Sequence, residues 1–176
     1  MPNILTYNKT ILESDDRPAM NHTFKSTDFT PDKNVNITGK IISIVYKFIF
    51  RYGGTSSPSW TGYASIISNG GTEYKGTDLT KTIYKNTDNE ISLTIPKDNC
   101  PPASVINSND FSIKLTTTEC SKNPYVPKES KMSIIITYGI QSYIYYNSEW
   151  KAATPYVFNG TAWIPATVNI YDNEWI

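Results

Sequence analysis

Few residues in this 176-residue chain have the chemistry needed for acid–base, nucleophilic or metal-dependent catalysis. A Ser-His-Asp or Cys-His arrangement would have to use His22, because it is the one histidine in the chain. His22 lies in a polar segment, where a histidine is usually a surface residue. The two cysteines, Cys100 and Cys120, also lie in polar stretches, and a metal site or a disulfide framework needs more than these residues. We therefore expect no catalytic residue, no metal and no cofactor, and leave open whether the two cysteines pair.

Carboxylates are the remaining candidates for catalysis. Glycoside hydrolysis uses two carboxyl groups about 5 to 9.5 Å apart across a cleft. Asp88 with Glu90, and Asp15 with Asp16, lie close in sequence, but both pairs fall in turn-like or polar segments where carboxylates are usually solvated. The polar run 107–110 is not followed by the further oxygen ligand and glycine of a calcium loop. Glycan hydrolysis is therefore only the third hypothesis for this chain.

The most specific pattern is an aromatic repeat near the C-terminus. Segments 146–150, 158–163 and 171–175 each contain an aromatic residue, then Asn or Asp with small polar residues, then a tryptophan, and the tryptophans are 13 and 12 positions apart. This length predicts β-hairpins, because Asn-Gly and Asp-Asn fit tight turns and the flanking aromatic residues become cross-strand neighbours. The residues expected to form an interface or a glycan-stacking surface are Tyr146, Trp150, Tyr156, Phe158, Trp163, Tyr171 and Trp175.

Short hairpins of this kind cannot bury their own aromatic rings. A few short strands do not bury enough surface to offset the chain entropy lost on folding. A buried Trp or Tyr removes about 150 to 250 Å² from water, so rings left in solvent forfeit much stability. We expect them to pack against the rest of the chain or against symmetry-related copies. Exposed rings at repeat spacing can instead stack on sugars, which is the alternative interpretation.

The run from Trp150 to Trp163 reads WKAATPYVFNGTAW. It resembles the short repeats of the form W-K-x-A-x-x-Y-V-x-N-G-x-x-W near the C-termini of tail and other minor structural proteins of phages that infect low-GC Gram-positive bacteria. With its flanking half-repeats, the resemblance covers about a fifth of the chain. It implies a virion protein, made in the cytoplasm of a bacterial host, and it brings no catalytic residues with it.

The elements that must support this repeat are predicted to be strands. The chain holds 13 Tyr, 6 Phe and 4 Trp with many β-branched residues, a composition that favours strands. Between 40 and 52, one face is wholly apolar: Ile42, Ile44, Tyr46, Phe48, Phe50 and Tyr52. Further strands are predicted at 61–68, at Tyr74, and at 83–84, 91–95, 111–116 and 132–140. Without any helical apolar stripe, this pattern predicts an all-β fold, an antiparallel β-sandwich that is jelly-roll-like.

Three segments follow from these predictions. Residues 1–37 are polar and broken by prolines, so they are expected to form an N-terminal arm in which only 23–30 supplies a short edge strand. Residues 38–141 are expected to form the β-sandwich domain. Residues 142–176 are expected to form an aromatic-repeat β-meander.

Charge and hydropathy narrow the range of partners. Sixteen basic residues balance sixteen acidic ones without a basic block, so nucleic acid is a poor partner. No run of about 18 apolar residues occurs and the N-terminus lacks a signal-peptide pattern, so we expect no membrane contact and a soluble protein made in a cytoplasm.

The function predicted from the sequence is a non-enzymatic structural component of a phage virion. A capsid or tail decoration, a fibre and a connector subunit all fit, and head and tail locations are not distinguished. The expected partners are other virion proteins and further copies of the chain, with a trimer favoured and a role in host attachment as an added hypothesis. The alternative is a carbohydrate-binding module that recognises bacterial surface glycans through the aromatic repeat.

Overall fold

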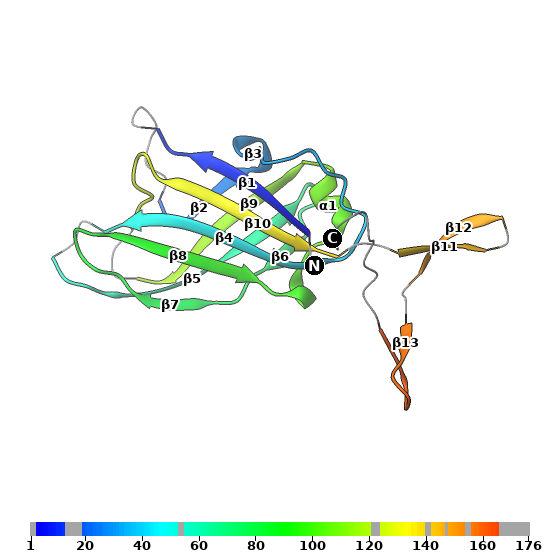
Figure 1. Cartoon of the computed structure of the whole chain (residues 1–176). Coiled ribbons are helices and arrows are strands. Elements are labelled where there is room, and N and C mark those ends of the chain that lie inside the picture. Colours follow the sequence, from blue (N-terminus) through cyan, green and yellow to red (C-terminus); the bar gives the residue numbers. More distant parts are fainter. Residues whose placement is uncertain are drawn as a thin grey trace, which may run out of the picture.

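The structure, a computed structural model, describes residues 3–12, 19–52, 55–120, 124–139, 142–146, 148–153 and 156–165 (Figure 1). Two antiparallel sheets pack face to face, and two hairpins follow them in the chain. The first sheet contains, in spatial order, β3 (Thr30–Pro31), β1 (Asn3–Thr10), β10 (Lys131–Tyr138), β4 (Ile41–Arg51) and β8 (Asp88–Ile95). The second contains β2 (His22–Lys25), β9 (Phe111–Glu119), β5 (Ser59–Ser68) and β6 (Glu73–Lys75), with β7 (Leu79–Thr82) also paired to β5.

The strand order is that of a jelly roll. The series β1-β10-β4-β8 faces the series β2-β9-β5-β6, so the chain passes repeatedly between the two sheets. Eight strands arranged as two such four-stranded sheets define the jelly-roll architecture. The prediction of an all-β sandwich is therefore confirmed.

Short helical turns occupy the connections at one end of the sandwich. They are η1 (Ser26–Asp28), η2 (Lys97–Asn99) and α1 (Ala103–Asn107). In the described part of the chain, no helix has the length and apolar character needed to cross a membrane.

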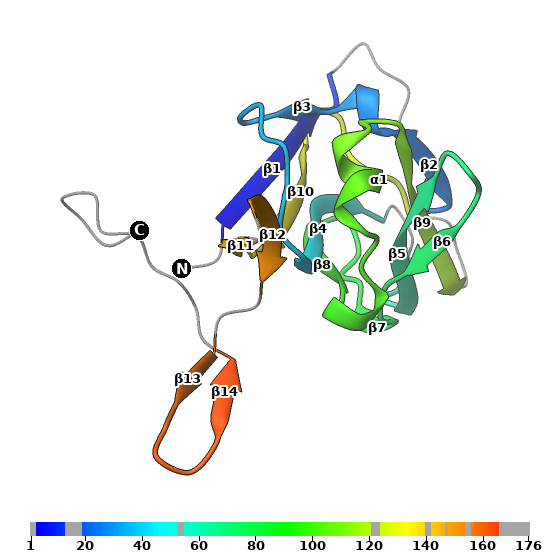
Figure 2. The same cartoon turned by 90° about the vertical axis from the view of Figure 1, so that its right-hand side faces the viewer.

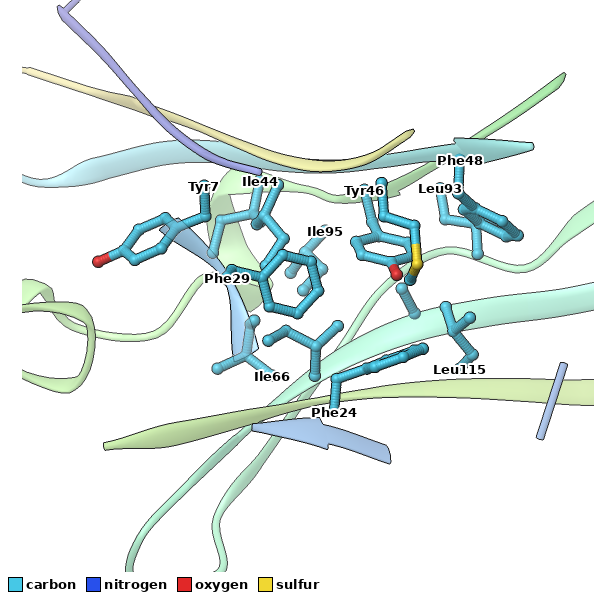
Figure 3. Packing of buried hydrophobic residues seen from close by; sticks show 14 of the residues in the cluster. Tyr7, Phe24, Phe29, Ile44, Tyr46, Phe48, Ile66, Leu93, Ile95 and Leu115 are labelled. Atoms are coloured by element: carbon cyan, nitrogen blue, oxygen red, sulfur yellow. The ribbon is translucent and has the colours of Figure 1, made fainter. Parts of the chain in front are cut away.

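The core lies between the two sheets and is rich in aromatic rings. Strand β4 alternates as predicted over most of its length, with Ile44, Tyr46 and Phe48 almost fully buried. Figure 3 shows these side chains pointing toward Phe24 and Leu115 of the opposite sheet. The rings of Tyr46 and Phe48 lie 5.0 Å apart, a spacing typical of favourable aromatic pairs. The apolar alternation of the strands is thus satisfied by burial between the sheets.

One residue of the predicted apolar face of β4 is not buried. Ile42 is 37% exposed, whereas its neighbour Ile41 is buried. Ile41 lies opposite Tyr138 and Ser43 lies opposite Thr137, so Ile42 is the extra residue of a β-bulge. A bulge shifts the alternation by one residue and thereby exchanges the inner and outer positions.

The prediction of an N-terminal arm over 1–37 is wrong for the described residues of that segment. Asn3–Thr10 forms β1, which pairs along its whole length with β10 inside the first sheet. Leu5 and Tyr7 are buried in the core. The predicted edge strand within 23–30 is present as β2. Asn3–Thr10 is therefore part of the sandwich, and the described residues before 38 contribute to its core.

The predicted strand at 83–84 is also displaced, because β7 ends at Thr82. Ile83 is buried immediately after it, and its N–H donates to the carbonyl of Pro58, which is outside the ladder.

The C-terminal segment forms two separate hairpins in place of one meander. Strands β11 (Ser142–Tyr146) and β12 (Glu149–Ala153) pair with each other, as do β13 (Tyr156–Phe158) and β14 (Trp163–Pro165). Both hairpins lie outside the sandwich, beyond the end at which β10 finishes (Figures 1 and 2). Residues 166–176 lie outside the described part of the chain.

Candidate interaction surface

The hairpin β13–β14 brings two aromatic residues of the repeat into contact. Phe158 lies directly opposite Trp163, and directly opposed residues project from the same face of an antiparallel pair. Their ring centroids are 5.4 Å apart with an interplanar angle of 48°. The predicted cross-strand aromatic pair is confirmed for this repeat.

The turn of this hairpin explains the Asn-Gly of the repeat. The Oδ1 atom of Asn159 accepts hydrogen bonds from the N–H groups of Thr161 and Ala162 at 3.0 and 2.9 Å. The N–H of Asn159 donates to the carbonyl of Ala162 at 3.1 Å and closes the loop. Gly160 has φ +97°, a conformation that favours glycine. The turn is thus specified locally, by the side chain of one residue and the backbone freedom of the next.

The aromatic rings of this hairpin are exposed to solvent in the single chain. Tyr156, Phe158 and Trp163 are 55%, 51% and 69% exposed. Tyr156 and Phe158 are two positions apart on one strand, so they share a face with Trp163. We call these three residues the aromatic face. Residues 156–165 contain no charged side chain, so the hairpin offers an apolar surface without ionic groups.

The other predicted aromatic residues are described less fully. In β11–β12, Tyr146 lies opposite Glu149, and the residue opposite Trp150 is Tyr145. The repeat predicts that Trp150 pairs with Tyr146, but Trp150 pairs with Tyr145, one residue earlier in the chain. The side chains of Tyr146 and Trp150, and the whole of Tyr171 and Trp175, lie outside the described residues.

Of the two carboxylate pairs considered for hydrolysis, the structure describes Asp88 with Glu90, and these two lie on one strand and not on opposite sides of a cleft. Asp88 and Glu90 are both exposed on the outer side of β8. Asp88 lies 3.4 Å from the Nη1 atom of Arg51, and both side chains of this ion pair are about half exposed. Exposed pairs of this kind contribute little to stability and are common on protein surfaces. Asp15 and Asp16 lie outside the described residues.

Two further groups from the sequence analysis have structural roles. His22 is exposed on β2, with its ring centroid 4.5 Å from that of Phe24. Asn107, at the start of the polar run 107–110, accepts a hydrogen bond from the N–H of Ile37 and donates one to its carbonyl. This amide therefore ties the end of α1 to the segment before β4.

The two cysteines are free and half-buried. The thiol of Cys100 donates to the carbonyl of Ile95 at 3.5 Å. Burial raises the pKa of Cys100 to about 11, against a smaller lowering by a backbone hydrogen bond from Ile44. The thiol is therefore protonated at neutral pH, and the thiolate is the form that attacks electrophiles or binds metals. Among the described residues, no group of three or more His, Cys, Asp or Glu is placed to hold a metal ion.

The outer faces of the two sheets differ in charge, which the sequence analysis did not reveal. On the sheet of β9, β5 and β6, Lys114 lies 3.9 Å from Glu73, and Lys75 lies over the ring of Tyr63 at 4.0 Å. On the other sheet, one half of the outer face has no charged residue. We call this half the uncharged patch, and it consists of Ile4, Thr6, Ser43, Val45, Thr94, Ile135 and Thr137.

The uncharged patch depends on register. Thr6 lies opposite Ile135, Ile135 opposite Val45, and Val45 opposite Thr94, so one row crosses four strands. Their sequence neighbours are the inward residues of the core, which leaves these side chains on the outside. In the sequence, the patch is indicated only by β-branched residues at the outward positions of these strands.

Neither a protein-family model nor a curated protein matches this chain. Among solved structures, a chain in the structure of infectious bursal disease virus, Gt strain, is similar with a TM-score of 0.29 and 15% sequence identity. The match covers 78% of this chain and 33% of that chain, so this chain spans about a third of the length of its match. A similarity of this size does not assign a function, which must be argued from the surface of this chain.

Proposed function

We propose that this protein is a non-enzymatic structural subunit of a virion and works as one copy within a homo-oligomer. The observation that carries the proposal is the aromatic face of β13–β14, whose three rings are half to two-thirds exposed in the single chain. A two-stranded hairpin is at best marginally stable alone. It therefore needs a companion surface, and in an assembly that surface is supplied by another subunit.

The magnitude of the exposed apolar area supports this proposal. A fully buried aromatic side chain removes about 150 to 250 Å² from water, so the exposed parts of three rings amount to roughly 300 to 400 Å². At about 25 cal/mol per Å², covering this area gives roughly 7 to 10 kcal/mol before the entropic cost of association. A gain of that order is comparable with the whole stability of a domain, so an uncovered aromatic face forfeits a large term.

The fold and the repeat together favour a virion over other assemblies. Jelly rolls are used by viral capsid domains and by lectins, so the fold alone is compatible with either role. The repeat from Trp150 to Trp163 resembles those of phage tail and minor structural proteins, and this resemblance favours the virion. The proposed partners are further copies of the chain and other virion proteins.

Glycan binding is the second candidate, and the open aromatic face favours it. Tyr156, Phe158 and Trp163 present three rings on one side of a hairpin. A flat aromatic ring offers an apolar face for stacking against a sugar, and Tyr156 and Trp163 also carry an O–H or N–H group that can form a hydrogen bond. Host attachment would combine both candidates, because a virion subunit can also bind a bacterial surface glycan.

The mass of the full-length protein at about 1 to 50 µM, measured by light scattering and sedimentation, tests the assembly. We expect a defined oligomer that the double substitution Phe158→Ser and Trp163→Ser shifts toward the monomer mass of 19.8 kDa. The matched control is Tyr84→Ser, because Tyr84 is 61% exposed on the loop before β8. A wild-type chain that is strictly monomeric contradicts the proposal. If this monomer also binds a glycan array and the double variant does not, the second candidate is favoured.

The virion location has its own test. Peptides of this chain should be found by mass spectrometry in purified particles of the phage that encodes it. Particles that lack these peptides, from a culture in which the chain is expressed, contradict a virion role whatever the oligomeric state.

A further inference from the structure

Two surfaces of this chain are apolar or uncharged and are not covered by any other residue that the structure describes. One is the aromatic face of β13–β14, and the other is the uncharged patch on the outer side of β1, β10, β4 and β8. Figure 1 looks onto this side of the sandwich, and no described element crosses it. The opposite sheet, by contrast, carries the charged groups Lys114, Glu73 and Lys75 on its outer side, as a solvated face does.

The uncharged patch has the composition of an interface. Its rows consist of aliphatic and hydroxyl side chains, with Ile4 48% exposed at one end. Ile42, the bulged residue of β4, adds a further exposed aliphatic group beside Ser43. Charged residues stand only at its borders: Asp32, whose carboxylate accepts a hydrogen bond from the N–H of Thr6 at 3.0 Å, and Lys47, which lies opposite Ser133 and one row beyond Val45. The centres of protein interfaces are depleted in charge in the same way.

We infer that the aromatic face of each copy docks on the uncharged patch of a second copy, and that the two copies exchange their hairpins reciprocally. This inference rests on the proposed function and names the partner of its site. Docking places the uncharged hairpin 156–165 on an uncharged surface, so no ionic group is buried without a partner. No described residue of the same chain covers either surface, and the inference assigns the receiving surface to another copy.

The area of contact explains why the exchange must be reciprocal. The aromatic face offers roughly 300 to 400 Å², and an equal area of the patch is covered on docking. One docked hairpin therefore buries about 700 Å² in total, which is below the 1,200 to 2,000 Å² of a stable interface. Two hairpins exchanged between the same two copies bury about 1,400 Å², which falls within that range. A two-fold exchange of this kind is also closed, so it does not propagate into fibres.

Charged substitutions in the patch test the inference. In the full-length protein, Val45→Lys and Ile135→Lys each place an ammonium group in the proposed contact, and both side chains point away from the core. We expect each to raise the dissociation constant, measured by sedimentation, at least about tenfold. The matched control is Ile67→Lys, because Ile67 lies on the outer side of β5 in the charged sheet. This control should leave the dissociation constant unchanged.

A double-mutant cycle distinguishes a shared contact from two separate ones. If hairpin and patch touch, Ile135→Lys combined with Trp163→Ser should raise the dissociation constant by much less than the product of the single effects. Multiplicative effects, or an oligomer indifferent to Val45→Lys and Ile135→Lys, overturn the inference and leave the proposed function standing. A wild-type monomer at 50 µM overturns both. Circular dichroism of each variant shows whether the sandwich is folded, and Thr6→Lys replaces any variant that is not.

Discussion

Cys100 shows at the scale of one residue how burial sets reactivity. Its thiol is half-buried beside Ile95, and burial raises its pKa to about 11. At pH 8 only about one thiol in a thousand is then ionised, compared with roughly a quarter for a free cysteine of pKa about 8.5. Because the pKa of Cys100 is higher in the folded than in the unfolded chain, its protonated thiol contributes to the free energy of unfolding in full at pH values below the unfolded-state pKa. This contribution is lost as the pH rises from the unfolded-state pKa to about 11.

Alkylation of Cys100 by iodoacetamide tests this expectation. Its rate should increase about tenfold per pH unit from pH 7 to pH 10, because only the thiolate reacts. Peptide mass spectrometry follows Cys100 and Cys120 separately in the same sample, and Cys100→Ser identifies the signal. A rate for Cys100 that levels off near pH 9 would show that its pKa is not raised.

For single residues, the sequence predicts features that depend on near neighbours in the chain better than features that depend on pairing with a distant strand. The hairpin turn at Asn159 and Gly160 was predicted, because its hydrogen bonds join residues within the turn itself. The exposure of Ile42 was not, because the bulge depends on how β4 pairs with Thr137 and Tyr138, far away in the sequence. Alternation alone carries no information about such a shift in register.

Strand β1 is the element that sequence reasoning missed. Asn3–Thr10 contains two buried apolar residues, Leu5 and Tyr7, but the apolar Ile4 beside them is exposed and the others are polar, so its alternation is weak. Its strand conformation comes from pairing with β10, which lies at the other end of the sandwich sequence. The propensity of a segment is a weak guide where a distant partner supplies both its hydrogen bonds and its burial.

The role of β1 in the core leads to a stability prediction. Leu5 is 2% exposed, so Leu5→Ala leaves a cavity between the sheets. We expect the free energy of unfolding to fall by about 2 to 5 kcal/mol, measured by urea denaturation. Thr10→Ala, at the exposed end of the same strand, is the control and should change it by less than about 0.5 kcal/mol. Equal and small effects of both substitutions would restore the interpretation of 1–37 as a dispensable arm.

The hairpins, by contrast, could be predicted as elements because each is closed over a short stretch of chain. Their existence follows from the repeat, and Phe158 faces Trp163 as expected. The sequence could not predict that β12 and β13 do not pair with each other. A turn signal marks where the chain reverses, but it does not say which strand edges pair afterwards.

At the scale of the whole molecule, the strands predicted a sandwich but not the order of its strands. The jelly-roll order places β1 beside β10 and β2 beside β9, and these pairings join the two ends of the sandwich. The same pairings create the uncharged patch, because Ile4, Val45 and Ile135 come from three distant segments. A surface assembled in this way is visible only once the register is known. The aromatic face, formed within ten residues, was visible from the sequence alone.

Assembly through these two surfaces should depend little on ionic strength. An interface between charged groups weakens as salt screens it, whereas burial of apolar area does not, and sulfate strengthens such burial. The chain has no net charge, so long-range repulsion between copies is small at neutral pH. Raising NaCl from about 50 to 500 mM should therefore change the dissociation constant less than about threefold, and 0.5 M ammonium sulfate should lower it. Sedimentation velocity measures both. Weakening by tenfold or more in NaCl would instead place charged residues, such as those of the sheet of β9 and β5, at the interface.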